Sequence, residues 1–245
     1  MQIIHLPKEA MPTGLVSCDF RRPTFRDRRE ASAKYPGQAA NPGYTLEQLF
    51  FAYCLEKIND NPLPPNPNDY ISRLEGFPLE DAQFAIEVFL EMFTLNQEMA
   101  SAAKDYGLEL KKQLASSYLI PSHKLPGGGP SVAFRAPLLQ DSISANRAVP
   151  REETSYTAEE LLLARCIEEI DGKMIDNKGG IEILDNFWHE DVQFLLGVFY
   201  SMFTLDRPKR ETARSWAKRL RGESSDSTFA KIPPAGSTKT SATSK

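Results

Sequence analysis

The sequence predicts a helix-rich α+β protein made of two tandem homologous units, each a short β element followed by about three helices. Three observations support this prediction. Two stretches about 110 residues apart repeat the same residues in the same order, each contains amphipathic helical patterns, and each follows a short strand-like segment. Because solenoid repeats are only about 20 to 50 residues long, this spacing indicates a duplicated domain.

The repeat consists of two matching blocks. Residues 44–58 align with residues 156–170, and residues 80–95 align with residues 190–205, where both copies end in Met-Phe-Thr-Leu. Weaker matches extend the unit upstream: Leu-Pro at 6–7 and 125–126, and Phe-Arg-Arg-Pro at 20–23 against Phe-Arg-Ala-Pro at 134–137. We therefore predict units at residues 1–117 and 118–222, followed by a Ser/Thr/Lys-rich extension at 223–245.

The first helix of each unit begins at a recognisable cap. Thr45 with Gln48, and Thr157 with Glu160, form the capping-box pattern that opens a helix. The apolar residues behind each box recur at helical spacing and predict helices that run to about Asn59 and Gly172. Further helices are predicted over residues 80–93 and 190–203, and over 97–114 and 208–221.

The remaining segments are predicted as strands or extended chain. Residues 15–20 and 131–134 are typical of short strands, and each ends before a proline. The segment 61–68 contains four prolines and is predicted to be extended. Residues 223–245 contain too few large apolar side chains to order themselves.

Composition indicates a soluble globular chain. It has 245 residues, 41% of them hydrophobic, and a net charge of −4, which argues against a generally basic nucleic-acid binder. No apolar run approaches the roughly 20 residues that would span a bilayer, and the first residues lack a secretory signal pattern. The three cysteines form neither a disulfide framework nor a zinc pattern. We expect a cytoplasmic protein without metal or cofactor.

No catalytic group is predicted. His5, His123 and His189 are isolated from one another, and His189-Glu190-Asp191 is interpreted as a helix start whose carboxylates cap backbone N–H groups. Cys54 and Cys166 occupy equivalent places on apolar helix faces, where a thiol behaves as a small hydrophobic group, and Cys18 is interpreted in the same way. The pattern does not indicate an enzyme.

Gly127-Gly128-Gly129 is a second feature that could suggest chemistry. A phosphate-binding loop follows a strand and opens a helix, whereas this run precedes a predicted strand and lacks the Gly-Lys-Ser/Thr sequence. The run is therefore interpreted as a hairpin turn or a flexible connection between the units, and not as a nucleotide site.

Two basic clusters are candidate partner-binding surfaces, opposite in charge to residues 60–91, which hold seven acidic residues and one arginine. Opposite patches can orient subunits in an assembly. A solvated face and a nucleic-acid interface are the alternatives, although the latter lacks a recognisable motif. The candidate residues are Arg21, Arg22, Arg26, Arg28, Arg29, Arg207, Lys209, Arg210, Arg214, Lys218, Arg219 and Arg221.

The N-terminal part also resembles a known family. The Leu-Pro opening, a strand running into residues 20–24, Arg-Arg-Glu at 28–30 and an apolar helix led by Asp81 resemble the baseplate hub and tail-assembly proteins of contractile-tailed bacteriophages. The motif positions are Leu6, Pro7, Arg22, Pro23 and Thr24, whose role in the resemblance is structural. The second copy departs from the motif with Arg-Ala-Pro-Leu at 135–138.

The resemblance implies a structural or assembly component of a phage tail baseplate, without catalytic residues, that contacts other tail or baseplate proteins within a multi-subunit assembly. It would lie in the host cytoplasm during assembly, and in the virion tail if retained. One alternative is a transient tail-assembly chaperone that is absent from the mature particle. Another is an enzyme whose site forms between the two units and brings Cys54, Cys166 or His189 together.

Overall fold

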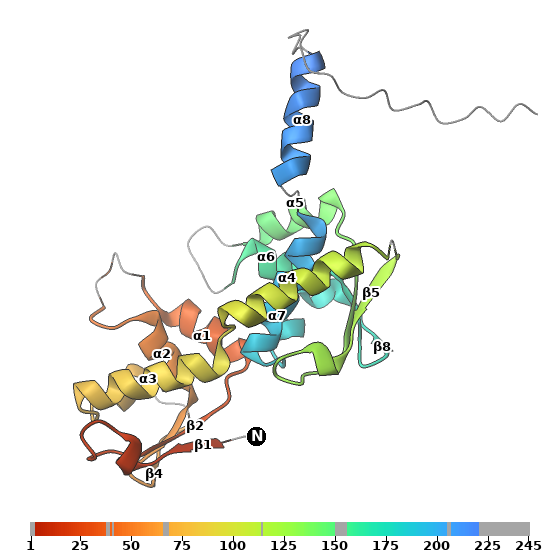
Figure 1. Cartoon of the computed structure of the whole chain (residues 1–245). Coiled ribbons are helices and arrows are strands. Elements are labelled where there is room, and N and C mark those ends of the chain that lie inside the picture. The colour runs from red at the N-terminus through yellow and green to blue at the C-terminus, as the bar shows by residue number, and fades with distance from the viewer. Residues whose placement is uncertain are drawn as a thin grey trace, which may run out of the picture. The chain divides into compact units, whose positions relative to one another are not determined.

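The computed structural model describes residues 3–37, 40, 42–65, 69–113, 115–149, 156–204 and 207–220. Met1–Thr204 form one compact unit, and Leu205–Lys245 form a second one, in which helix α8 (Arg207–Leu220) is described. The α+β class is confirmed: helices are combined with two small antiparallel sheets (Figure 1). The predicted extension at 223–245 lies outside the described residues.

The first series of elements occupies roughly the first half of the chain. Its strands form one antiparallel sheet in the order β1-β2-β3-β4, and two short 3-10 helices, η1 (Lys8–Ala10) and η3 (Ile71–Leu74), lie in its loops. The elements are β1 (Ile3–Leu6), β2 (Cys18–Arg21), α1 (Phe25–Lys34), α2 (Leu46–Cys54), β3 (Leu55–Ile58), β4 (Asn61–Pro62), α3 (Leu79–Phe93) and α4 (Gln97–Lys111).

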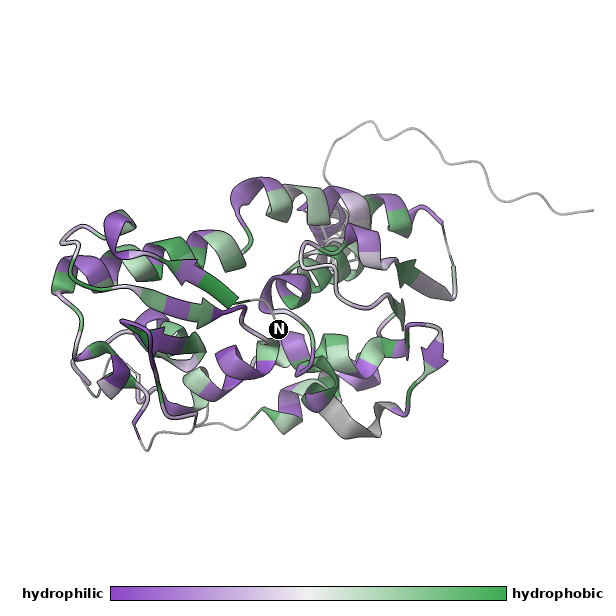
Figure 2. Ribbon diagram, turned by 90° about the horizontal axis from the view of Figure 1, so that it is seen from below, coloured by the Kyte–Doolittle hydropathy of each residue, from purple (hydrophilic) through white to green (hydrophobic). Residues whose placement is uncertain are grey.

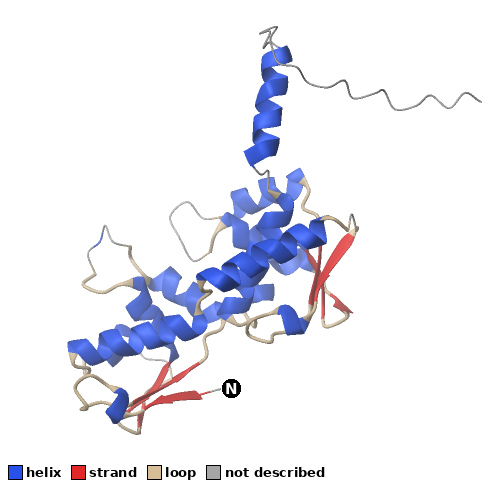
Figure 3. Cartoon of the chain, viewed as in Figure 1, coloured by secondary structure: helices blue, strands red, loops and turns tan. Residues whose placement is uncertain are grey.

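The second series repeats this order and begins at Ser117. Its sheet has the order β5-β6-β7-β8, and the strands of the two sheets form separate groups in Figure 3. The elements are β5 (Ser117–Ile120), η4 (Ser122–Lys124), β6 (Val132–Arg135), α5 (Leu139–Ala148), α6 (Ala158–Cys166), β7 (Ile167–Ile170), β8 (Lys173–Met174), η5 (Asn177–Leu184) and α7 (His189–Phe203). Helix α8 takes the place in sequence that α4 has in the first series.

The two sheets also agree in register. Ile4 pairs with Phe20 in the first sheet, and Tyr118 pairs with Phe134 in the second. The pairing with the third strand shifts just before Phe20 in one sheet and just before Phe134 in the other. A bulge is a specific feature of a fold, so its presence at the same place in both sheets is consistent with the tandem duplication that the sequence predicts.

The predicted ends of the first helices, near Asn59 and Gly172, are wrong. Helix α2 ends at Cys54 and α6 at Cys166, and the chain continues directly into strands β3 and β7. Each strand then turns through two residues with positive φ: Asn59 and Asp60 in one series, Asp171 and Gly172 in the other. Such pairs favour the two-residue turn of a tight hairpin, so pairing with β2 or β6 overrides the helical pattern.

The other predicted elements are found within a few residues of their expected bounds. Thr45 and Thr157 both form the expected capping boxes. Helices α1 and α5 were not predicted, and an ion pair fixes the start of each: Arg21 binds Asp27, and Arg135 binds Asp141. Of the proline-rich segment, Asn61–Pro62 forms the short strand β4, and residues 66–68 lie outside the described part.

Each series has its own aromatic core. In the first, the ring of Phe20 lies 5.7 Å from that of Phe51 and 5.8 Å from that of Phe89, both edge to face. In the second, Phe134 lies 5.5 Å from Phe199 and 6.2 Å from Phe203. Edge-to-face contacts add to the stabilisation that burial itself provides.

The second core also contains side chains from the first series. Phe25 of α1 and Ala103 and Leu110 of α4 belong to its buried cluster, because α1 contacts η5 and α7, and α4 packs along α7 (Figure 1). Helices in Figure 2 carry both hydrophilic and hydrophobic residues, as helices that cover a core do. The second core is therefore completed by the first half of the chain.

Candidate functional site

The first predicted basic cluster lies where α1 meets the second series. The guanidinium of Arg22 reaches Glu190 at the start of α7, with its Nε 2.9 Å from the carboxylate, and donates to the carbonyl oxygen of Gly127 at 3.0 Å. It also lies 5.0 Å from the ring centre of Trp188. The Glu190 side chain is 5% exposed and that of Arg22 is 17% exposed, so this ion pair is largely removed from water.

The other arginines of this cluster also have partners within the chain. Arg29 donates from its Nε to Asp185 at 3.0 Å, and Arg26 lies 3.4 Å from the same carboxylate. Arg21 forms a two-pronged pair with Asp27, with both distances 2.6 Å. Because Asp185 is buried, its negative charge requires cationic partners nearby.

Backbone contacts join the same two segments. The N–H of Phe25 donates to the carbonyl oxygen of Phe187 at 2.8 Å, and the N–H of His189 donates to that of Pro23 at 3.2 Å. The side chain of Phe25 is only 2% exposed within the second core. The segment with the predicted family motif therefore anchors the first series to the second.

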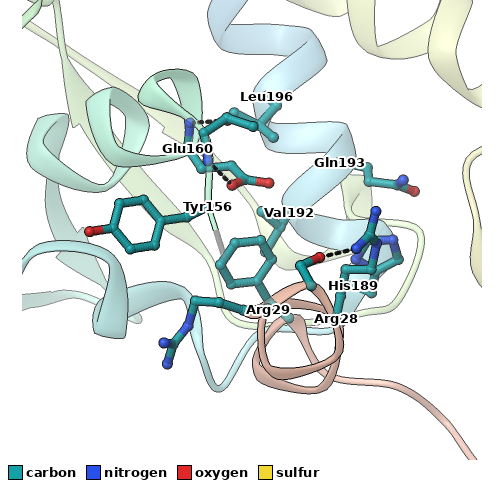
Figure 4. Close-up of a pocket in the computed structure, with 11 residues that line it drawn as sticks. Arg28, Arg29, Tyr156, Glu160, His189, Val192, Gln193 and Leu196 are labelled. Carbon is teal, nitrogen blue, oxygen red and sulfur yellow. Dashed lines mark hydrogen bonds between the residues drawn. The ribbon is translucent and has the colours of Figure 1, made fainter. Parts of the chain in front are cut away.

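A pocket of about 250 Å³ lies beside this junction, between α1 and helices α6 and α7 (Figure 4). Its lining combines charged, polar and apolar side chains from both series. The residues are Phe25, Arg28, Arg29, Ser32, Tyr156, Thr157, Glu160, His189, Val192, Gln193 and Leu196.

His189 and Glu160, two titratable groups in the pocket, have shifted pKa values. Burial lowers the pKa of His189 to about 3, so its imidazole is neutral near neutral pH, and its Nδ1 has no hydrogen-bond partner in the described structure. Burial also raises the pKa of Glu160, whose carboxylate accepts from the N–H of Thr157 at 2.7 Å. The ring of His189 packs against that of Phe50 with centres 5.2 Å apart.

These contacts give the pocket groups structural roles. Glu160 completes the capping box of α6, and Arg28 donates to Ser32 one turn further along α1 and lies 5.9 Å from the ring centre of Phe50. His189 faces an aromatic ring instead of an acid or base partner. A general base needs a positioned partner for proton transfer, and the contacts of His189 do not supply one.

The capping interpretation of Glu190 and Asp191 is wrong, and Asp81, at the equivalent place in α3, does not cap its helix either. Neither α3 nor α7 has a side-chain cap. Asp191 instead accepts from the N–H groups of Gly127 and Gly129 at 2.5 and 3.0 Å, and Asp81 accepts from the N–H and hydroxyl of Thr13 at 2.9 and 2.6 Å. Both aspartates thus hold the loop between the first two strands of their own series.

The glycine run is accordingly a structural loop. It follows the short helix η4 between β5 and β6, and a Cβ on Gly129 would lie 2.4 Å from the carboxylate of Asp191. A larger residue at this position would have to displace the Asp191 carboxylate, to which the N–H of Gly129 donates. Burial raises the pKa of Asp191 to about 6 despite these hydrogen bonds.

The three cysteines are buried, as predicted. Burial raises the pKa of Cys18 and of Cys166 to about 12, and raises that of Cys54 well above its ordinary value. Cys54 belongs to the first core and Cys166 to the second. The structure therefore does not bring these two thiols together in one site, and neither is found as the reactive thiolate.

The second basic cluster lies on α8, outside the pocket. Arg207 pairs with Glu211 one turn along, with 2.9 Å between their charged groups, and both side chains are mostly exposed. Lys209, Arg210, Arg214 and Lys218 are exposed on the same helix. The side chain of Arg219 and the whole of Arg221 lie outside the described part of the structure.

Sequence reasoning missed the acidic partners of the first cluster, Asp185 and Glu190, and the aromatic contact from Trp188. Each lies more than 150 residues from its arginine, so no local pattern indicated the pairing. His5 forms a 2.6 Å contact with Asp19 on the exposed edge of the first sheet, and His123 lies in η4. The three histidines therefore do not converge on one site.

Comparison with family models, with curated proteins and with solved structures finds no match to this chain. Among the described residues, no helix is long and apolar enough to cross a membrane, and no group of three or more His, Cys, Asp or Glu side chains is arranged to hold a metal ion.

Proposed function

We propose that the protein is a structural or assembly component of a phage tail baseplate that acts through protein–protein contacts. The observation that carries this proposal is that side chains of the first series complete the core of the second. Helix α4 leaves its own series to cover α7 of the next, and the Phe25 side chain enters the second core. A unit that is completed by a neighbouring unit is suited to assembly.

The charges of the motif segment are consistent with this role. Arg22 and Arg29 are held by buried carboxylates, so they stabilise the pairing of the two series. The mostly exposed Arg26 side chain and, on the exposed part of α8, Arg214 and Lys218 are the proposed contacts for other tail or baseplate proteins. Charged rims of this kind orient partners and accelerate their encounter.

Mass spectrometry of purified particles tests the proposal. The particles should come from the genome that encodes this chain and from the same genome with its reading frame interrupted. A structural component is expected in the particles at a fixed ratio to the tail proteins, and its interruption should prevent complete tails. Normal particle numbers and complete tails without the chain would overturn the proposal.

The second candidate is a transient tail-assembly chaperone that is absent from the mature particle. It is favoured by the exposed apolar side chains on α3, namely Leu79, Phe84 and Met92, which could shield an apolar partner before that partner is assembled. The same experiment separates the candidates, because a chaperone would be needed for complete tails but missing from them.

A further inference from the structure

The contact between α4 and α7 depends on small side chains. Ala103, Gly107 and Leu110 of α4 are buried against α7. A Cβ on Gly107 would lie 2.5 Å from the carbonyl oxygen of Val198, and a Cβ on Gly197 would lie 3.0 Å from the Cβ of Ala103. The two helices therefore approach closely along one narrow face of α4.

Helix α8 repeats the small-residue face of α4 at equivalent positions of the repeat. With the 110-residue spacing of the repeat, Ala103, Tyr106, Gly107 and Leu110 correspond to Ala213, Trp216, Ala217 and Leu220. Both helices thus place two small residues one turn apart, beside an aromatic ring and a leucine. In α8 the indole of Trp216 is 56% exposed and Leu220 is 82% exposed.

Among the described residues of the first compact unit, no helix covers α3 in the way that α4 covers its counterpart α7. Phe84 and Met92 are 36% and 45% exposed, whereas their counterparts Phe194 and Met202 are 5% and 1% exposed. A shallow depression lined by Glu87, Val88, Glu91 and Met92 runs along this face of α3. Its position corresponds to the part of α7 that receives Gly107, because Val88 is the counterpart of Val198.

Helix α8 as a whole and the uncovered face of α3 are also opposite in charge. Glu87 and Glu91 are the counterparts of Gly197 and Ser201 in α7. The uncovered face of α3 therefore carries two carboxylates that the corresponding face of α7 lacks. Helix α8 contains six Lys or Arg residues and one Glu. Complementary charges favour association and select the partner.

We propose that α8 of one copy of the chain packs on α3 of a second copy, in the manner in which α4 packs on α7 within the chain. This inference rests on the proposed assembly function, and it names the partner as the protein itself. Each copy offers one α8 and one α3, so the contact is head to tail and forms rings or open chains. Ala217 replaces Gly107, and Glu87 and Glu91 replace Gly197 and Ser201, so these helices approach less closely than α4 and α7.

The test uses the full chain and two variants, each of which blocks one side of the contact. Glu87→Lys with Glu91→Lys turns the α3 face basic, and Ala213→Glu with Ala217→Glu places carboxylates in the small-residue face of α8. Matched controls are Glu9→Lys with Glu75→Lys, two exposed acidic residues elsewhere, and Ser215→Glu, whose counterpart in α4 is the exposed Asp105.

Sedimentation equilibrium over a range of concentrations is the measurement. The unchanged chain and both controls should associate, and each blocking variant should associate at least about tenfold more weakly. An equimolar mixture of the two blocking variants should form a one-to-one complex and nothing larger, because only one intact α3 and one intact α8 can meet. Circular dichroism checks that the variants remain folded.

Three results would overturn the inference: an unchanged chain that stays monomeric at all concentrations, blocking variants that associate as tightly as the controls, or a mixture without the one-to-one complex. Its failure can be told apart from failure of the proposed function. A monomer that is present in particles at a fixed ratio to tail proteins contradicts only the self-association. Association of a chain that particles do not require contradicts only the baseplate role.

Discussion

At the scale of single residues, His189 shows how burial determines chemistry. Its counterpart in the first series is Leu79, so the second series has placed an imidazole where a purely apolar side chain is possible. Burial lowers the pKa of His189 to about 3. The folded protein therefore excludes a proton that the unfolded chain binds below pH 6.5.

The variant His189→Leu should remove the pH dependence of stability that this proton causes. Between pH 6.5 and pH 3 the native protein should lose stability relative to the variant by roughly 1.4 kcal/mol per pH unit as the pH falls, because only its unfolded state gains the proton. Urea unfolding at several pH values measures the difference. Asp191, whose pKa is raised, stabilises the folded state as the pH falls through this range. Because both proteins contain Asp191, its contribution drops out of the difference between them. Parallel stability curves would contradict the prediction.

The pair of Arg22 and Glu190 permits a second test at this scale. Glu190→Ala leaves the largely buried guanidinium without its carboxylate and should lower the free energy of unfolding by roughly 3 kcal/mol. Glu211→Ala breaks the exposed pair with Arg207 and should change it by less than about 0.5 kcal/mol. Equal effects of the two substitutions in denaturant unfolding would show that the junction pair does not stabilise the fold.

At the scale of elements, the close approach of α4 and α7 depends on Gly107. Alanine is the better helix former, yet its Cβ would meet Val198 and Ser201. Gly107→Ala should therefore lower the free energy of unfolding by roughly 1 to 3 kcal/mol, because the helices must separate.

Gly76→Ala is the matched control, since nothing lies within 4 Å of the added Cβ and its φ is not positive. Thermal unfolding followed by circular dichroism compares the two variants. A Gly107→Ala protein that is as stable as the control, or more stable, would mean that the two helices can separate without loss and that the small-residue face is not needed.

At the scale of the whole molecule, the second series depends on the first. Its core includes Phe25, Ala103 and Leu110, which lie outside residues 118–222. A fragment of residues 118–222 should therefore lack a cooperative thermal transition, whereas residues 1–222 should unfold in a single one. Calorimetry of the fragment 118–222 and of residues 1–222 measures these thermal transitions. A fragment that unfolds cooperatively would establish the second predicted unit as an independent domain.

The candidate site was only partly predictable at this scale. The basic segment around Arg22 was identified from composition, but its acidic partners were not, because each contact joins residues more than 150 positions apart. The baseplate role and the boundary between the predicted units stay predictions. The α+β class, by contrast, followed from the repeat and from helical spacing, which are local signals.

The sequence by itself indicated the helices that follow the capping boxes at Thr45 and Thr157, the apolar helices over 80–93 and 190–203, and the burial of the cysteines, because these depend on residues within a few turns of each other. Only the tertiary structure decided that Leu55–Ile58 is a strand, that the two helix-leading aspartates bind loops, and that α4 covers α7. Pairing and packing between distant segments provide free energies comparable to local propensities, so they override local patterns wherever the two compete.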